Sequence, residues 1–240
     1  MSWASIHRDV VDGRPVHVKS TGYDARLEAE GLAALAEAGV PVPEVLAVDE
    51  HRLVVATVGG PPSWGLLGAA LAGAHRSTSR MFGWHRDNVI GSLPQDNRPG
   101  PHWPTFYIER RIRPWLAALP TTVRRRLEDA CDGPMADLLD HGVAPSLVHG
   151  DLWAGNVVDG AWLIDPAVHF ADRELDLAFA RVFGGIPDEF FDGYAAAWPL
   201  DEGWERRVPA LQLYHLLVHV ELFGRSYLPM VEARLEKLRA

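Results

Sequence analysis

The first quarter of the chain alternates short apolar runs with polar turns around one stretch of helical period. Between residues 25 and 38 the apolar residues recur at helical spacing, which predicts a helix, and Gly39 is a suitable stop. Asp12-Gly13 predicts a tight hairpin turn ahead of the first strand. Apolar runs predict strands at 15–19, 45–48 and 53–58. This region therefore predicts a small β-rich unit with one helix.

The remainder of the chain has a mainly helical period. The strongest breaker cluster is GGPP at 59–62, so we predict a small lobe of residues 1–58 and a larger lobe of residues 59–240. Residues 77–104 predict a long loop, and loops of that length are usually functional. Predicted helices cover 66–76, 106–119, 123–141 with an interruption at Gly133-Pro134, 174–183, 189–198, 204–223 and 227–238. Short strands are predicted at 147–149, 157–158 and 162–164, the last two joined by a turn at Asp159-Gly160.

Composition narrows the class of protein without changing this picture. Of the 240 residues, 48% are hydrophobic, enough for a sizeable core, and strands that precede helices are typical of an α+β fold. The formal net charge of −9 argues against a nucleic-acid partner. No apolar run reaches the roughly 18 residues of a membrane helix, and residues 1–5 lack signal-peptide features. The single cysteine, Cys131, excludes an intramolecular disulfide, and we interpret it as a partly buried helix residue. We therefore predict a cytoplasmic protein with no membrane partner.

Candidate chemistry gathers around residues 149–165. Phosphoryl transfer needs a carboxylate that orients the attacking hydroxyl, oxygen ligands for Mg²⁺ and a cation on the phosphates of ATP. Asp151 and Asn156 stand five residues apart, the spacing of the catalytic Asp and the metal-binding Asn in protein kinases. A strand–turn–strand hairpin would bring Asn156 and Asp165 to one bound metal. Each residue alone is common in turns and caps, but the set favours a phosphotransfer site.

A lysine in the first lobe completes the set. Lys19 ends the alternating strand 15–19, where a lysine that contacts phosphates is expected, although an isolated strand-end lysine is usually just exposed. Its partner would be a glutamate on the following helix. Glu28 and Glu30 both qualify, because each lies at one edge of the apolar stripe and periodicity does not separate them.

These residues lie in a pattern that resembles a known family. The segment HGDLWAGN at 149–156, followed by IDP at 164–166, resembles the fructosamine (ketosamine) kinases, relatives of the aminoglycoside phosphotransferases within the protein-kinase-like fold. The resemblance covers nearly the whole chain from about Val16 onward. Further matching segments are FGW at 82–84, DNVIG at 87–91, PQDN at 94–97, DRELDLA at 172–178, FGG at 183–185 and LYHLLVH at 213–219. The resemblance implies a two-lobed, protein-kinase-like α+β fold. It also implies ATP- and Mg²⁺-dependent phosphorylation of a sugar hydroxyl of a ketosamine, free or on a protein, with fructosamines, ribulosamines and erythrulosamines as alternatives.

The resemblance also implies residue roles. Asp151 would be the catalytic base or hydroxyl-orienting group, and Lys19 would contact the phosphates. Glu30 is favoured over Glu28 as the partner of Lys19, because the family glutamate precedes a Gly-Leu step like the one at 31–32. The implied Mg²⁺ ligands are Asn156 and Asp165, and the implied adenine-binding hinge is Ala56, Thr57 and Val58. The implied acceptor contacts are Trp153 and, with weaker claims, Trp84, Trp204, His215 and His219, although core packing is the preferred interpretation of the two histidines.

The chain departs from the family at its beginning, and this leaves alternatives open. Only 18 residues precede Lys19, where relatives carry another strand and a Gly-rich phosphate loop, and we expect residues 5–7 to be a remnant of that loop. One alternative is a kinase for aminoglycosides or small alcohols, against which Trp153 counts. Another is a nucleotide-binding pseudokinase, against which the complete transfer site counts. The resemblance implies a role in removing early glycation adducts, and the oligomeric state is not indicated, with a monomer compatible.

Overall fold

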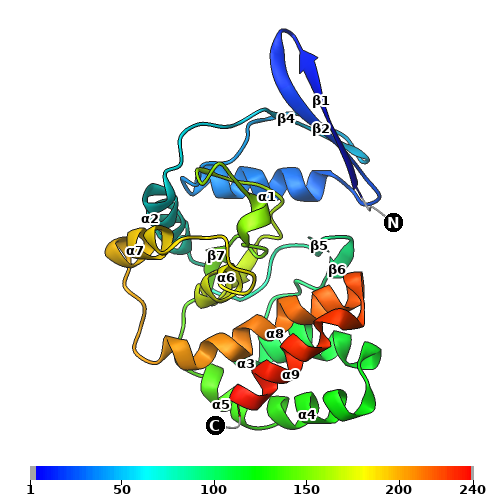
Figure 1. Cartoon of the computed structure of the whole chain (residues 1–240), viewed down its shortest axis with the longest axis vertical. Coiled ribbons are helices and arrows are strands. Elements are labelled where there is room, and N and C mark those ends of the chain that lie inside the picture. The colour runs from blue at the N-terminus through cyan, green and yellow to red at the C-terminus, as the bar shows by residue number, and fades with distance from the viewer. Residues whose placement is uncertain (1–3, 239–240) are drawn as a thin grey trace.

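A four-stranded antiparallel sheet and one helix make up the N-terminal part of the computed structural model, which describes residues 4–238 (Figure 1). Residues 1–3, which contribute to the signal-peptide argument, lie outside the described residues. The strands run in the order β1 (Ala4–Val11), β2 (Arg14–Thr21), β4 (Arg52–Ala56) and β3 (Val45–Val48). Helix α1 (Arg26–Glu37) packs on this sheet through Leu32, which contacts Leu53 in a small apolar cluster. The predicted β-rich unit with one helix is therefore confirmed.

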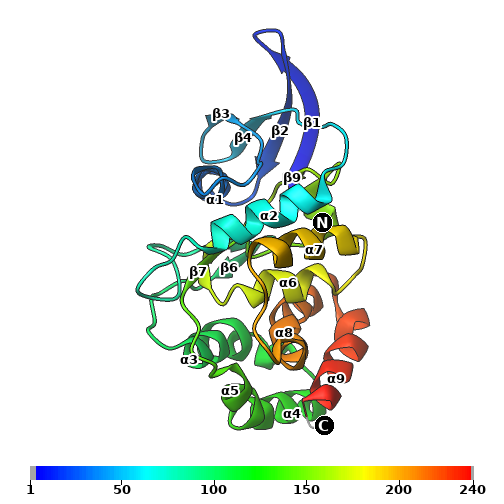
Figure 2. The ribbon, with the colours of Figure 1, turned by 90° about the vertical axis from the view of Figure 1, so that its left-hand side faces the viewer.

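The β1–β2 hairpin projects beyond the rest of the molecule (Figure 2). Asp12 and Gly13 form its turn with φ of 50° and 77°, the left-handed conformation that a two-residue turn between twisted strands requires. The predicted turn is confirmed. Residues 5–7, expected as a loop remnant, pair with residues 18–20 of β2, so that expectation is wrong. All of β1 is a strand because each of its residues pairs with a residue of β2.

The C-terminal part is mainly helical and follows residues 57–63, where we keep the proposed lobe boundary at Gly59. Helix α8 packs on α6 and α9, and these three helices contribute to the largest apolar core. Helix α2 packs on α7 in a second apolar core. Figure 1 shows α4, α5 and α9 at the end of the molecule opposite the hairpin. The helices are α2 (Trp64–His75), α3 (Trp103–Tyr107), α4 (Thr121–Cys131), α5 (Pro134–Leu139), α6 (Glu174–Ala180), α7 (Asp188–Ala197), α8 (Trp204–Phe223), the short 3₁₀ turn η4 (Arg225–Tyr227) and α9 (Leu228–Lys237). Cys131 is buried at the end of α4, deeper than predicted.

One predicted helix is divided into three kinds of helix. After α3 the chain widens into a π-helix, η1 (Ile108–Ile112), and then tightens into a 3₁₀-helix, η2 (Arg113–Ala118). Pro114 gives a physical reason, because it has no N–H to donate and its ring conflicts with the carbonyl four residues earlier. The wide turn carries Arg111, whose side chain is completely buried.

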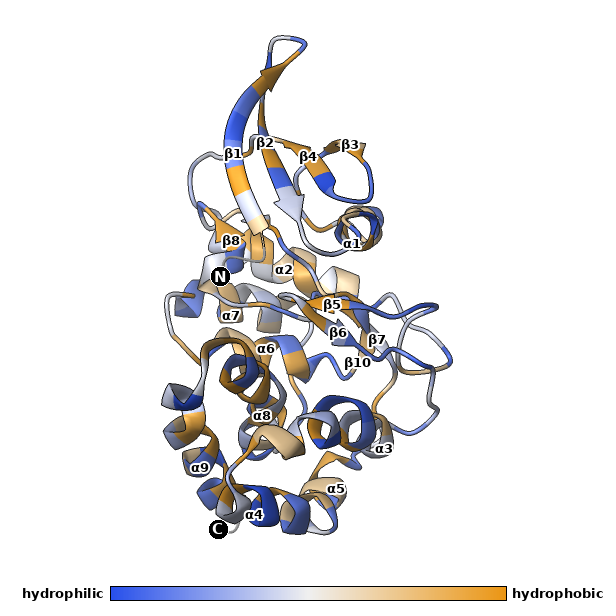
Figure 3. Cartoon of the chain, turned by 90° about the vertical axis from the view of Figure 1, so that its right-hand side faces the viewer, coloured by the Kyte–Doolittle hydropathy of each residue, from blue (hydrophilic) through white to orange (hydrophobic). Residues whose placement is uncertain are grey.

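Short strands lie between the sheet and the helices (Figure 3). The loop predicted at 77–104 contains a hairpin of β5 (Asn88–Ile90) and β6 (Leu93–Gln95). Strand β7 (Ser146–Val148), predicted at 147–149, pairs with β10 (His169–Ala171). The sequence pattern did not predict β10. The hairpin of β8 (Val157–Val158) and β9 (Trp162–Leu163) is confirmed. None of the helices in residues 4–238 has both the length and the apolar character needed to cross a lipid bilayer.

Candidate active site

The loop that carries Asp151 connects β7 to β8 and ends in a 3₁₀ turn, η3 (Ala154–Asn156). Gly150 takes φ of 82°, and a Cβ at this position would collide with the carbonyl oxygen of Ala167. Glycine is therefore required for the loop to approach the segment after Asp165 so closely. The side chain of His149 supports the same approach, because its Nε2–H donates to the carbonyl of Ile164 at 3.0 Å.

Two buried side chains hold the peptide that precedes Asp151. The carboxylate of Asp176 on α6 accepts the N–H of His149 at 2.7 Å and that of Gly150 at 2.9 Å. The Nε2–H of His215 on α8 donates to the carbonyl oxygen of Gly150 at 2.8 Å. Because His215 is fully buried and stacked on Phe179, it supports the loop, and the prediction that it contacts the acceptor is wrong.

Asp151 shares its surroundings with the amide of Asn156. The Nδ2 of Asn156 donates to the backbone carbonyl of Asp151 at 2.8 Å and to its Oδ2 at 3.0 Å. Burial raises the pKa of Asp151 to about 7, against the lowering effect of the Asn156 hydrogen bond, and the nearby Asp165 carboxylate adds to the rise. With its nitrogen directed to Asp151, Asn156 keeps its Oδ1 as an oxygen ligand for a metal ion.

Asp165 follows β9 and lies beside the lysine of the N-terminal sheet. Its φ of 55° is unusual for a residue other than glycine. One of its carboxylate oxygens, Oδ1, lies 3.0 Å from the Nζ of Lys19. The preceding residue, Ile164, donates its N–H to the carbonyl of Asn156 at 3.0 Å. The β8–β9 hairpin thus brings Asn156 and Asp165 together as predicted.

Lys19 forms its ion pair with Glu28. The Nζ of Lys19 lies 2.7 Å from Oε2 of Glu28, and both side chains are about nine-tenths buried. The hydroxyl of Tyr23 donates to the same carboxylate oxygen at 2.8 Å. Burial alone would lower the pKa of Lys19, but the carboxylates of Glu28 and Asp165 outweigh it and the pKa is raised, so the lysine stays charged.

Glu30, which was predicted to pair with Lys19, lies elsewhere. Two residues along a helix turn the side chain by roughly 200°, so Glu28 and Glu30 face different parts of the molecule. The Oε1 of Glu30 accepts the indole N–H of Trp84 at 2.7 Å, and its other oxygen binds Arg86. The predicted Lys19–Glu30 pair is therefore wrong. In this position Trp84 joins α1 to the segment before β5 and lies outside the cavities that Asp151 and Lys19 line, so its predicted acceptor contact is also wrong.

A cavity of about 180 Å³ opens in front of Asp151. Part of its lining is the charged group just described, with Lys19, Asn156 and Asp165. Another part, called here the aromatic side, is apolar and aromatic, and it includes Val89, Ile90, Trp153, Val218, His219, Leu222 and Phe223. Trp153, a predicted acceptor contact, does line this cavity, whereas Trp204 is buried under the guanidinium of Arg181, so its predicted contact is wrong.

His219 is the polar side chain on the aromatic side of the cavity. Its Nδ1–H donates to the carbonyl of His215, one helical turn earlier, at 2.8 Å. Burial lowers the pKa of His219, so the ring is neutral near pH 7. Because Nδ1 carries the proton, Nε2 has a free lone pair and can accept a hydrogen bond.

A second cavity, of about 280 Å³, lies under the N-terminal sheet and shares Lys19, Glu28 and Asp165 with the first. The predicted hinge residues Ala56, Thr57 and Val58 line it. The N–H groups of Ala56 and Thr57 donate to the carbonyls of Glu44 and Pro15. In the described part of the chain, the N–H of Val58 is the hinge donor that has no protein acceptor.

A strand lysine paired with a helix glutamate, an Asp and Asn on one loop and a further Asp after a hairpin define a protein-kinase-like phosphotransferase. The fold comparison agrees. An aminoglycoside phosphotransferase in a ternary complex with ADP and hygromycin B aligns with a TM-score of 0.67 at 17% identity, over 100% of this chain and 91% of that one. At this identity the likeness shows the fold alone, and it confirms the predicted two-lobed α+β architecture.

The sequence comparisons identify the family. The family model for fructosamine kinase matches residues 17–240, and the chain belongs to this family, as the motifs predicted. A probable ketoamine kinase of Thermus thermophilus is 39% identical over 211 residues, which are 85% of this chain and 78% of that protein. The crystal structure of a candidate fructosamine-3-kinase from Thermobifida fusca aligns with a TM-score of 0.88 at 36% identity, over 98% of this chain and 94% of that one.

Proposed function

We propose that this protein transfers the γ-phosphate of ATP to a sugar hydroxyl of a ketosamine. One observation carries the proposal: the carboxylate of Asp151 lies where an apolar, aromatic cavity meets a charged group that includes Lys19 and Asp165. Such a junction places a hydroxyl acceptor on one side and the phosphates on the other. Membership of the fructosamine kinase family and the named relatives support the sugar acceptor.

The cavity under the N-terminal sheet would take ATP. The free N–H of Val58 would donate to the adenine, and Lys19 would meet the α- and β-phosphates at the boundary between the two cavities. The ion pair with Glu28 keeps the lysine in place and charged. ADP in the complex of the aminoglycoside phosphotransferase supports a nucleotide in this fold. ATP as donor and a single cysteine in the sequence fit the proposed cytoplasmic setting.

The donor set fits Mg²⁺. Asn156 offers an amide oxygen and Asp165 a carboxylate, which are hard oxygen ligands, and the remaining positions would go to phosphate oxygens and water. When bound, the ion would neutralise charge on the phosphates. The chain's own contribution is to hold the two ligands on adjacent ends of the β8–β9 hairpin.

Asp151 would act on the acceptor. The hydroxyl donates a hydrogen bond to the carboxylate, and its oxygen attacks the γ-phosphorus while the bond from this phosphorus to the ADP oxygen breaks. The hydroxyl proton passes to Asp151, which the nearby Asn156 amide keeps oriented. The products are a phosphorylated ketosamine and ADP. A phosphorylated ketosamine is unstable, so we propose that the reaction serves the removal of early glycation adducts.

The aromatic side of the cavity favours a sugar on an amine over a polycationic antibiotic. The face of Trp153 suits the apolar face of a sugar, and Phe223 and His219 continue the aromatic surface. A secondary ammonium could lie against these rings and donate to the Nε2 of His219. Recognition of a polycation would call for several carboxylates on this side, and the residues that line it are apolar or aromatic.

A comparison of acceptors tests this proposal. We expect kcat/KM for fructosyl-lysine or ribulosyl-lysine to exceed that for an aminoglycoside or a simple alcohol by roughly 10²-fold or more, because only the ketosamine meets both Trp153 and His219. The measurement is ADP release coupled to detection of the phosphorylated acceptor. Preference for the aminoglycoside would overturn the substrate assignment, and ATP binding without transfer to any acceptor would favour a pseudokinase.

The pH dependence of the reaction follows from Asp151. Its pKa of about 7 means that the fraction in the carboxylate form, which accepts the proton, rises as the pH rises through 7. We expect kcat/KM for the ketosamine to increase about tenfold per pH unit on the acid side and to level off above about pH 8. Initial rates at saturating Mg-ATP check this. A rate that is flat across the acid side would contradict a titrating Asp151.

A further inference from the structure

We propose that Asn88 and Gln95 are positioning residues whose side-chain amides hold the backbone after Asp165 in the geometry that a metal ion needs. The inference rests on the proposed role of Asp165 as a metal ligand. The proposal also gives a function to residues 87–91 and 94–97, which take no direct part in the phosphate transfer.

The two amides bind consecutive carbonyl groups. The Nε2 of Gln95 donates to the carbonyl of Ala167 at 3.1 Å, and the Nδ2 of Asn88 donates to that of Val168 at 2.9 Å. The Nε2 of Gln95 also donates to Oδ1 of Asn88 at 2.7 Å, so the two side chains form one unit. Both are buried, at 1% and 7% exposure, where an unmade hydrogen bond is costly.

The same backbone segment is held from the opposite side by the loop that carries Asp151. The N–H of Ala167 donates to the carbonyl of His149 at 2.9 Å, and the ring of His149 donates to the carbonyl of Ile164 at 3.0 Å. Asp165 lies between these fixed points with its φ of 55°. This conformation is strained for a non-glycine residue, which keeps it only where the surroundings impose it.

The orientation of the two amides is fixed by groups behind them. The hydroxyl of Tyr214 on α8 donates to Oε1 of Gln95 at 2.6 Å, so the nitrogen of Gln95 must face the carbonyls. The Nδ2 of Asn97 donates to Oδ1 of Asn88 at 2.8 Å, which fixes that amide in the same way. The guanidinium of Arg111, buried in the π-helix η1, donates to Oδ1 of Asn97 at 2.6 Å.

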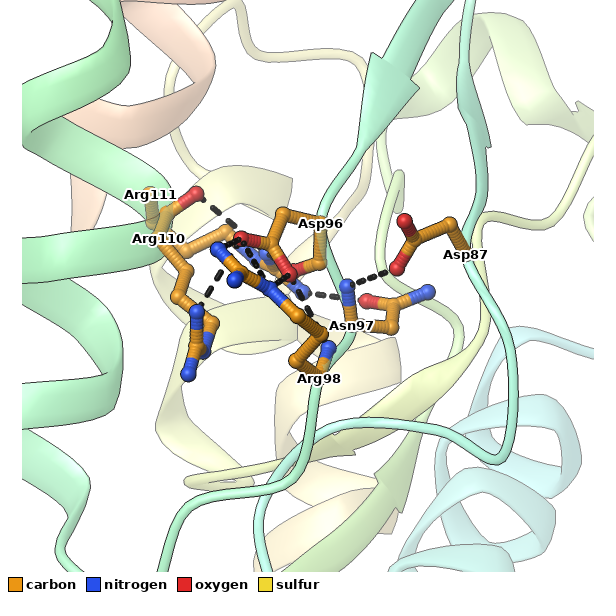
Figure 4. Close-up of polar contacts among 6 residues, drawn as sticks. All are labelled: Asp87, Asp96, Asn97, Arg98, Arg110 and Arg111. Atoms are coloured by element: carbon orange, nitrogen blue, oxygen red, sulfur yellow. Dashed lines mark hydrogen bonds and ion pairs between the residues drawn. The ribbon is translucent and has the colours of Figure 1, made fainter.

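Figure 4 shows the charged residues at the surface end of this hydrogen-bond network. The carboxylate of Asp87 accepts the N–H of Asn97 at 2.8 Å. Asp96 is held by Arg98 and by Arg110 at 3.0 Å, and these hydrogen bonds and charges keep the pKa of its carboxyl far below the usual range. The guanidinium of Arg111 also donates to the carbonyl of Asp96 at 2.5 Å, so the network runs from charged groups at the surface to the carbonyls of Ala167 and Val168.

The chain offers a matched control in Gln212. This buried glutamine donates its Nε2 to the carbonyl of Ala178 at 2.8 Å and accepts from Arg234 at 2.8 Å. It has the same chemistry as Gln95, but it joins α8 to α6 and lines neither cavity of the site. A purely structural role for Gln95 would give Gln95→Leu and Gln212→Leu the same consequences.

The test compares Gln95→Leu and Asn88→Leu with Gln212→Leu in the full chain. Amide hydrogen exchange of the nucleotide-free proteins should accelerate in residues 164–169 for the first two variants and stay unchanged there for the control. The affinity for Mn²⁺ in the presence of ADP, measured by electron paramagnetic resonance, should fall about tenfold for the first two variants. The Mg²⁺ concentration for half-maximal rate should rise in parallel, with less than about a twofold change in the KM of the ketosamine.

Equal exchange and equal Mn²⁺ affinity in Gln95→Leu and the wild type would overturn the inference, and so would the same losses in Gln212→Leu. If Gln95→Leu does not fold, Gln95→Asn keeps the amide but is one methylene too short, and the same results are expected. A wild type that binds Mn²⁺ and ADP but transfers no phosphate would overturn the proposed function. The exchange and Mn²⁺ comparisons would still decide the role of the amides.

Discussion

Replacement of Asp151 by asparagine should lower kcat by roughly 10²–10⁴-fold with the fold and nucleotide binding intact, because the variant keeps the shape of the side chain and loses only the proton acceptor. The amide can still accept the hydrogen bond from Asn156, and the loop is held by Asp176 and His215, none of which the substitution touches. The measurement is the single-turnover rate with Mg-ATP and a ketosamine.

The same variant tests a second, independent prediction, which concerns the free energy of unfolding. The pKa of Asp151 is about 7 in the folded protein and near 4 when unfolded, so the contribution of this carboxyl to stability falls as pH rises from about 4 and is fully lost above about 7. Asparagine cannot ionise. Asp151→Asn should therefore equal the wild type in stability at low pH and exceed it by about 1–2 kcal/mol at pH 8, with partial exposure of the site limiting the gain.

Denaturant unfolding of both proteins at pH 4 and pH 8 checks this. Wild-type levels of kcat in Asp151→Asn would remove Asp151 from the chemistry. A variant that is equally destabilised at both pH values would show that asparagine disturbs the loop, and the kinetic loss would then have a structural cause.

The second large effect concerns the ion pair of Lys19. Glu28→Gln should lower kcat/KM for ATP by roughly 10²-fold, because the neutral amide no longer holds the buried ammonium against the attraction of Asp165. Glu30→Gln is the matched control, since it lies on the same helix and carries the same change. We expect a less than threefold effect on kcat/KM for ATP from Glu30→Gln, with some loss of stability from the weakened contacts to Trp84 and Arg86.

Lys19→Met tests the same ion pair by removing its cation. It should lose nucleotide affinity and kcat together, and it should also destabilise the protein because Glu28 is left buried without its cation. Isothermal titration with Mg-ADP and initial rates measure both effects. An equal loss of kcat/KM in Glu28→Gln and Glu30→Gln would contradict the assignment of Glu28, and undiminished activity in Lys19→Met would remove the lysine from the phosphate site.

Much of the site could be predicted because its residues are close together in sequence. The turn at residues 159–160 fixes the β8–β9 hairpin, and a hairpin of two short strands leaves little freedom in where Asn156 and Asp165 lie. The long helix α8 begins and ends as predicted, at Trp204 and Phe223, because its apolar pattern is long and Gly224 follows it. Local patterns suffice for such elements.

The choice between Glu28 and Glu30 could not be made from periodicity, and the motif favoured the wrong residue. Which face of α1 meets Lys19 depends on how the helix is rotated against the sheet. That rotation is set by the packing of Ala25 and Leu32 on Leu53, which are contacts between elements far apart in sequence. A Gly-Leu step after a glutamate gives no information on how the helix is rotated against the sheet.

Other features depend on partners that no local pattern reveals. Strand β10 has three residues and forms because β7 lies beside it. Asp176 reads as an ordinary helix residue, and its role depends on two backbone N–H groups 26 and 27 residues earlier. Asn88 and Gln95 likewise bind carbonyls about 70 to 80 residues away. The available signal in the sequence was a group of amide and acidic side chains within the loop predicted at 77–104, since such groups need partners wherever they are buried.

The fate of the γ-phosphate shows directly whether Asp151 directs phosphate transfer to a ketosamine. The wild type and Asp151→Asn would each be incubated with Mg²⁺, γ-labelled ATP and a fructosyl or ribulosyl amine, and the label would be located by ³¹P nuclear magnetic resonance and mass spectrometry. We expect one phosphate ester on a sugar hydroxyl with the wild type and almost none with Asp151→Asn. Label found only in inorganic phosphate, or ester formed equally by both proteins, would show that Asp151 does not direct transfer to a ketosamine.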